Sequence, residues 1–134
     1  MSAQSQKEYM LIFRGTDWHK GLSPEQMQQV SARMMAWFAG LKEEGKALGG
    51  APLERTGKVV SGKNGRMISD GPFAESKEAI GGYFLLQLDS FEEAVAIAQQ
   101  CPCLLHGAQV EVRPVAESCP LAGEPHEETL AVHA

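Results

Sequence analysis

The chain has 134 residues, of which 43% are hydrophobic and 22% charged, as in a soluble globular protein with one core. The formal net charge is −5, and the segment after Val115 holds four glutamates and no lysine or arginine. The remaining body is nearly neutral and interleaves its basic residues with acids, so no nucleic-acid partner is expected.

The chain shows no sign of an export signal or a membrane span. Residues 1–7 are polar and contain no apolar stretch, and no apolar run is long enough to cross a bilayer. A cytoplasmic location without membrane contact is therefore expected.

The chain has three cysteines, Cys101, Cys103 and Cys119. This odd number predicts free thiols rather than a disulfide framework. A soft-metal site at Cys101-Pro102-Cys103 with His106 is disfavoured, because the spacing matches neither a Cys-x-x-Cys knuckle nor a helical histidine pair. Thiols that close a helix end are expected instead. The sequence also lacks the glycine-rich loops of nicotinamide, flavin and nucleotide sites, so neither a metal nor a cofactor is expected.

The first half of the chain predicts a strand and a long helix. Residues 8–14 are apolar on both faces of a strand. Ser23, Pro24 and Gln26 have the pattern of a capped helix start, and Gly45 is a plausible C-terminal cap. Between them, apolar residues recur at helical spacing: Met27, Val30, Met34, Phe38 and Leu41.

The middle of the chain predicts a hairpin. Residues 49–52 indicate a turn or a short strand end, and Asn64-Gly65 lies between the short strands 58–61 and 66–69. Residues 74–80 have the pattern of one loose helical turn. A further strand over residues 83–88 carries apolar side chains on both faces.

The last part predicts a helix, a strand and a tail. Ser90 and Glu93 form a capping box, the buried stripe runs through Ile97 to Cys101, and Pro102 stops the helix. Residues 109–115 form the last strand. Residues 1–7 and the acidic tail 116–134 are expected to be poorly ordered, which leaves one domain over residues 8–115.

This order of elements predicts an α+β, ferredoxin-like (split βαβ) antiparallel sheet with both helices on one face, plus a hairpin insertion. Two of the strands are apolar on both faces, so the second face needs a cover. A second copy packed sheet to sheet supplies it, which predicts a homodimeric α/β barrel with a cleft between the sheets.

The run Asp70-Gly71-Pro72-Phe73 is a rigid turn, because Pro72 fixes its own φ and restricts Gly71. In the functional interpretation Asp70 lines a pocket beside the apolar anchor Phe73. In the structural interpretation Asp70 hydrogen-bonds its own turn and Phe73 is an ordinary core residue.

With these residues placed, the chain resembles the YCII-related superfamily, and specifically its DGPF-domain branch. The resemblance spans residues 9–115 and rests on four segments: 9–12, 70–78, 81–84 and 110–115. It implies a dimeric ferredoxin-like barrel with a cleft for a small molecule. Some relatives of this type are lyases or dehydrochlorinases with a His–Asp pair in that cleft. Alignment of the helix ends puts Met34 and Cys101 in those two positions, so that acid–base chemistry does not transfer.

The remaining candidate site residues come from loops and strand faces. Asp70 is a candidate general base, and His19 and His106 are candidate proton carriers whose loops could meet at one end of the sheet. Arg113, beside Glu111 on one strand face, would anchor a carboxylate or phenolate, with Tyr83 as a stacking or hydroxyl group. Exposed loop histidines and a structural Glu–Arg pair are the alternatives.

Two classes of function fit these features. The first is a dimer that binds, or transforms without a cofactor, a small anionic or aromatic metabolite in its cleft. The second is a regulatory or interaction module, because DGPF-domain relatives are linked to extracytoplasmic-function sigma factors. The rigidity of the turn at Asp70 favours the first.

Overall fold

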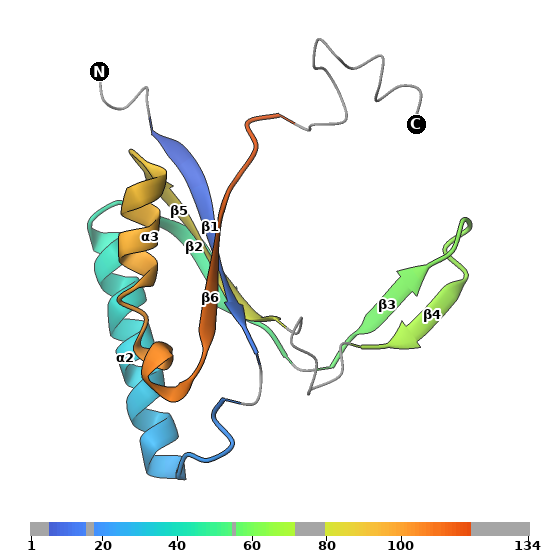
Figure 1. Ribbon diagram of the computed structural model, residues 1–134, viewed down its shortest axis with the longest axis horizontal. Coiled ribbons are helices and arrows are strands. Elements are labelled where there is room, and N and C mark those ends of the chain that lie inside the picture. The colour runs from blue at the N-terminus through green and yellow to red at the C-terminus, as the bar shows by residue number, and fades with distance from the viewer. Residues whose placement is uncertain (1–5, 16–17, 55, 72–79, 119–134) are drawn as a thin grey trace.

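A computed structural model describes residues 6–15, 18–54, 56–71 and 80–118 of the chain. Along the chain the elements are β1 (Lys7–Arg14), α2 (Pro24–Glu43), β2 (Ala47–Pro52), β3 (Lys58–Ser61), β4 (Met67–Asp70), β5 (Ile80–Leu88), α3 (Phe91–Ala98), the 3-10 helix η1 (Pro102–His106) and β6 (Gln109–Pro114). Figure 1 shows their arrangement. The predicted tail beyond Ser118 and most of the predicted polar N-terminus lie outside the described residues.

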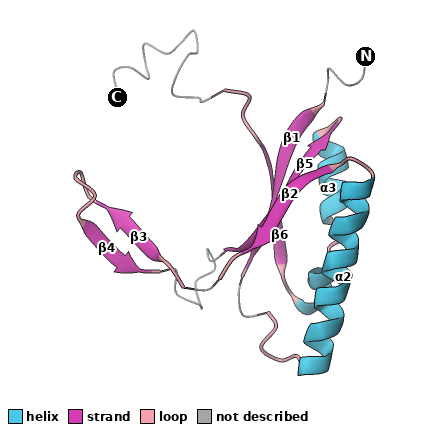
Figure 2. Ribbon diagram, turned by 180° about the vertical axis from the view of Figure 1, so that it is seen from behind, coloured by secondary structure: helices cyan, strands magenta, loops and turns pink. Residues whose placement is uncertain are grey.

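The main sheet has four antiparallel strands in the order β2-β5-β1-β6, and β3 and β4 form a separate hairpin. Both helices lie on one face of the main sheet, and the hairpin projects from the molecule on the other side (Figures 1 and 2). Strand β1 is central and pairs with both β5 and β6. The predicted ferredoxin-like layout with a hairpin insertion is thereby confirmed.

The alternation of side chains along β1 and β5 defines two different faces. Leu11 is opposite Phe84, and both are buried beneath the helices. Ile12 is opposite Tyr83, and both are half-buried on the other face, here called the open face. No described helix or strand covers the open face, so the cover expected from a second copy remains a prediction.

Helix α2 begins where the sequence predicts. The Ser23 hydroxyl accepts a hydrogen bond from the Gln26 N–H at 3.1 Å, and the Ser23 N–H donates to Oε1 of Gln26 at 2.9 Å. This reciprocal pair is a capping box, with Pro24 at the first helical position. At the other end Gly45 adopts a left-handed φ of 76°, which a side chain would disfavour.

The second helix is shorter than predicted. It ends at Ala98, and Cys101 precedes a 3-10 helix that Pro102 begins rather than blocks. At its start the Glu93 N–H donates to the Ser90 hydroxyl, while Oε1 of Glu93 accepts from the N–H of Asp89 rather than from that of Ser90. The turn over Pro102–His106 carries Cys101 and Cys103 into the core, where both are buried.

Five strands differ from the prediction in their bounds. Strand β4 spans Met67–Asp70 rather than 66–69, and β6 ends at Pro114 rather than Val115. The glycine-rich segment predicted as a turn or strand end belongs to the edge strand β2, because β5 provides a pairing partner. Strand β5 begins at Ile80, which was predicted to end a helical turn; residues 74–79 lie outside the described residues. Strand β1 begins at Lys7, one residue earlier than expected. The hairpin has the expected pairing, with Val60 opposite Ile68.

The core lies between the sheet and the helices, and its most buried large side chains are Leu11, Leu86 and Leu88. Burial of such a side chain contributes about 1.5–3 kcal/mol. No helix in the described part of the chain has the length and apolarity needed to cross a membrane.

Two glycines permit β2 and β5 to approach closely. A Cβ on Gly82 would lie 2.9 Å from the Ala51 carbonyl oxygen, and one on Gly50 would lie 2.6 Å from the Tyr83 carbonyl oxygen. Both contacts are with backbone atoms, which cannot rotate away. The edge strand therefore depends on these glycines.

Replacing Gly82 by alanine should lower the free energy of unfolding by about 1–3 kcal/mol, because the new methyl group forces the two strands apart. Gly49→Ala is the matched control, since a Cβ there would have no neighbour within 4 Å. Urea unfolding followed by circular dichroism measures both variants. Equal midpoints for the two would contradict this account of the strand pairing.

Candidate functional site

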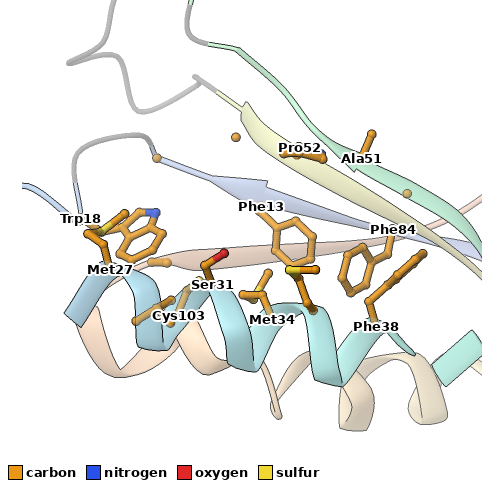
Figure 3. Close-up of a pocket in the computed structure, with 17 residues that line it drawn as sticks. Phe13, Trp18, Met27, Ser31, Met34, Phe38, Ala51, Pro52, Phe84 and Cys103 are labelled. Atoms are coloured by element: carbon orange, nitrogen blue, oxygen red, sulfur yellow. The ribbon is translucent and has the colours of Figure 1, made fainter. Parts of the chain in front are cut away.

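A pocket of about 550 Å³ lies between α2 and the β2–β5 side of the sheet. Figure 3 shows it between the helix and the strands, with Phe13 and Phe84 directed at it from the sheet and Met34 and Phe38 from α2. This volume is within the range of small-molecule sites, roughly 300–1,000 Å³.

The described lining is apolar. Its large side chains are aromatic rings and thioethers: Phe13, Trp18, Phe38, Phe84, Met27, Met34 and Met35. The strand side is formed mainly by small residues: Gly50, Ala51, Gly81 and Gly82. Ser31 supplies a hydroxyl, Cys103 supplies a thiol, and no described lining residue carries a charge or an imidazole. The lining suits flat, uncharged groups that can stack on aromatic rings.

Three sulfur atoms lie together beside the pocket. The Cys101 thiol donates a hydrogen bond to Met34 Sδ at 4.0 Å, and Cys101 Sγ accepts one from the Cys103 thiol. Cys101 and Cys103 are free thiols, exposed by only 4% and 6%. Met34 and Cys101 are the two positions that the resemblance assigns to a His–Asp pair, and the structure places them in contact.

The two thiols differ in acidity. The hydrogen bond from Cys103 lowers the pKa of Cys101 to about 7, assisted by the backbone N–H groups of Cys103 and Leu104 and opposed by burial. The same hydrogen bond, burial and the charge of the neighbouring thiolate raise the pKa of Cys103. Above about pH 7 the pair therefore carries one proton, on Cys103.

Both candidate histidines lie beside Trp18, at one edge of the pocket. His106 stacks on Trp18 with ring centroids 6.2 Å apart, and the His19 ring lies 5.3 Å from the same indole. Trp18 lines the pocket, and neither histidine is in the described lining. Their role in proton transfer remains a prediction.

The turn at Asp70 lies elsewhere. Asp70 ends β4, its side chain is 81% exposed, and its carboxylate accepts a hydrogen bond from Lys58 Nζ at 2.5 Å. Gly71 is buried, and its N–H donates to the Gly57 carbonyl. Pro72 and Phe73 lie outside the described residues. The structure thus does not bring Asp70 or Gly71 to the pocket.

The three candidates on strands share the open face. Tyr83 and Glu111 both lie opposite Ile12, one on each side of β1, so Tyr83 is two strands away from β6 rather than on its neighbour. Glu111 lies 2.7 Å from Arg14 Nη1 and 3.7 Å from Arg113 Nη1. Tyr83, Glu111 and Arg113 are therefore on the opposite side of the sheet from the pocket.

A family model described as the YCII-related domain matches residues 7–118 of this sequence. The chain belongs to the YCII-related family. Its assignment to the DGPF branch remains a prediction, because the matching model is described only as the YCII-related domain. No curated protein matches the sequence.

One solved structure similar to this YCII-related chain is 5-chloro-2-hydroxyhydroquinone dehydrochlorinase from Burkholderia phenoliruptrix AC1100, in complex with 2,5-dihydroxybenzoquinone. The two chains are 17% identical, with a TM-score of 0.47. The comparison covers 82% of this chain and 95% of that chain.

The sequence indicates the α2 side of the pocket only as a core stripe. Met27, Met34 and Phe38 have the helical spacing of ordinary core residues, so nothing in α2 alone distinguishes them. The missing signal is on the sheet, where Gly50 and Gly82 add no side chain between the Phe13 and Phe84 rings and the edge strand. Methionines opposite a strand edge of glycines would have indicated the cavity.

In a Cys119→Ser background, one thiolate should form with a midpoint near pH 7, because hydrogen bonds in the fold stabilise the Cys101 anion. The ultraviolet absorbance of the thiolate measures this titration. Cys101→Ser should remove this step, since Cys103 stays protonated. A rise in absorbance only near the ordinary thiol pKa of about 8.5 would contradict the assigned geometry.

The lowered pKa of Cys101 also makes the free energy of unfolding depend on pH. The pKa of Cys101 is lowered only in the folded chain, so the free energy of unfolding should increase as the pH rises from about 7 towards the ordinary 9.0. Above that pH the raised pKa of Cys103 should reverse the slope. Chemical denaturation at a series of pH values measures both parts. A free energy of unfolding that does not change over this range would contradict the shift.

Proposed function

We propose that this YCII-related protein binds a small, uncharged aromatic molecule in the pocket between α2 and the β2–β5 edge. The observation that supports this most directly is the described lining, which combines four aromatic rings with no charged side chain. An unpaired carboxylate would lose its hydration there without gaining a cation, at a cost of several kcal/mol. Of the two ligand classes expected from the sequence, this lining favours the aromatic one.

The pocket can bind a ring tightly enough to measure. Aromatic groups of the size of a side chain bury about 150–250 Å². At about 25 cal/mol per Å² this corresponds to roughly 4–6 kcal/mol before the entropic cost of association is subtracted. Even before that cost is subtracted, this corresponds to dissociation constants of about 1 mM to 40 μM. We therefore expect a simple probe to bind in the millimolar range, and a ligand that fills the volume to bind more tightly.

A matched pair of probes tests the proposal. A naphthol and the corresponding naphthoate share their rings and differ in charge, so isothermal titration should show the naphthol binding at least about tenfold more tightly. Ser31→Phe adds a ring at the pocket and should weaken naphthol binding by about tenfold or more. Ala32→Phe adds the same ring on the exposed next residue of α2 and should leave binding unchanged.

Tighter binding of the naphthoate than of the naphthol would indicate a different binding site. If the naphthoate binds more tightly and its affinity is lost in Arg113→Ala while Ser31→Phe has no effect, the ligand binds on the open face near Tyr83, Glu111 and Arg113. That result would contradict the pocket and favour the anionic ligand in a cleft of the dimer.

We also propose that a second copy covers the open face. The centre of this face is apolar: Met10 is opposite Leu85, and Ile12 is opposite Tyr83. The hairpin that projects on this side has four exposed apolar side chains, Val59, Val60, Met67 and Ile68. Exposed apolar area of this kind supports an interface between chains. A sigma-factor partner stays a prediction from the family resemblance.

Leu85→Lys should convert the dimer into a monomer, because it places a charge at the centre of the open face. Gln87→Lys adds the same charge on the same strand face, two residues away at its polar end, and should leave the dimer intact. Sedimentation velocity measures both. A wild-type protein that sediments as a monomer at micromolar concentration would contradict the proposed interface.

A further inference from the structure

The sulfur atoms of Met34, Cys101 and Cys103 converge from two elements that are far apart in the sequence. Met34 comes from α2, and the two cysteines frame the start of the 3-10 helix η1. Cys101 is the central member, since its Sγ lies 4.0 Å from Met34 Sδ and its thiol hydrogen-bonds that of Cys103. Pro102 restricts the backbone between the cysteines, and both cysteines belong to one buried cluster.

The two cysteines lie in a buried apolar cluster. Val30 joins the two cysteines in a buried cluster, and the residues packed around it are apolar, among them Phe13, Leu22 and Val110. The described residues contain no group of three His, Cys, Asp or Glu side chains that could hold a metal. The donors available here are therefore two thiols and a thioether.

This donor set selects a particular class of ion. Thiolate and thioether ligands favour soft cations such as Cu(I), whereas Zn²⁺ usually takes four ligands from cysteine, histidine and carboxylates, and Ca²⁺ and Mg²⁺ take oxygens. We propose that Met34, Cys101 and Cys103 form a three-coordinate binding site for a soft monovalent cation of the Cu(I) class.

The observed spacing fits such a site. A metal–sulfur bond of about 2.3 Å, as for thiolate ligands, puts neighbouring sulfurs of a planar three-coordinate site about 4.0 Å apart. The Cys101–Met34 distance is 4.0 Å. Little movement of these two side chains is thus needed to admit the ion. Met34 and Cys103 also line the pocket, which provides an entry path.

The charge and proton balance is simple. Each cysteine that coordinates the ion does so as a thiolate, so binding releases the remaining proton or protons of the pair to solvent. The cation stays in its oxidation state, and no electron is transferred. Backbone N–H groups of Cys103 and Leu104 already hydrogen-bond the Cys101 sulfur and can stabilise the anionic complex.

The test uses the full chain with Cys119→Ser, reduced and under anaerobic conditions, in competition with a chromophoric Cu(I) chelator. We expect one Cu(I) per chain, and X-ray absorption should show about three sulfur neighbours near 2.3 Å. Met34→Leu keeps the apolar volume and removes the thioether, so it should weaken binding by more than about tenfold.

Two controls separate the site from general thiol binding. Met67→Leu removes an exposed thioether on the β3–β4 hairpin, outside the pocket lining, and should leave the affinity unchanged. The double variant Cys101→Ala, Cys103→Ala should lose the stoichiometric site. Circular dichroism and thermal unfolding of every variant show that the fold is retained.

Three results would overturn the proposal. The first is an affinity for Cu(I) no higher than that of the double cysteine variant. The second is an unchanged affinity in Met34→Leu together with two sulfur neighbours in the absorption spectrum, which would remove the thioether from the site. The third is Zn²⁺ bound as tightly as Cu(I), which would remove the selectivity for soft ions.

Discussion

Small residues at the edge of the sheet decide where this YCII-related protein can hold a ligand. Elsewhere between sheet and helices the layer is filled by side chains such as Leu86 and Leu88, but Gly50 and Gly82 contribute no side chain to the sheet side of the pocket. These glycines are also required by the backbone, since a Cβ on either would lie less than 3.0 Å from a carbonyl oxygen of the neighbouring strand. The pairing of the edge strand and the volume of the pocket therefore depend on the same two residues.

The chemistry of the site follows from what surrounds that space. The resemblance to the family predicts a His–Asp pair, and this chain has a thioether and a thiol in contact at those positions. A thioether carries no proton, and above about pH 7 the one proton of the cysteine pair is on Cys103. An apolar, ring-lined cavity with sulfur beside it suits the binding of an uncharged aromatic group and of a soft cation. It gives little support to acid–base chemistry by described side chains.

Local signals in the sequence predicted most of the fold. The capped start of α2, the hairpin around Asn64-Gly65 and the alternation along β6 each depend on residues close in the chain. Strand β2 was not predicted as a full strand, because its glycines and proline form a strand only when β5 provides a partner. The pocket was missed for a related reason: it is defined by side chains that are absent, on segments far apart. The sequence predicts that Asp70 follows a hairpin, but it does not indicate that this hairpin projects away from the pocket (Figure 1).

The methionine methyl groups provide the most direct test of the site. Met27, Met34 and Met35 line the pocket, whereas Met10 lies on the open face and Met67 on the hairpin. NMR spectra of the protein with carbon-13 in these methyl groups, recorded during titration with a naphthol, report on all three regions at once. Binding in the pocket predicts that the signals of Met27, Met34 and Met35 shift together while those of Met10 and Met67 stay in place. A shift of Met10 with the three pocket signals unmoved would contradict the account.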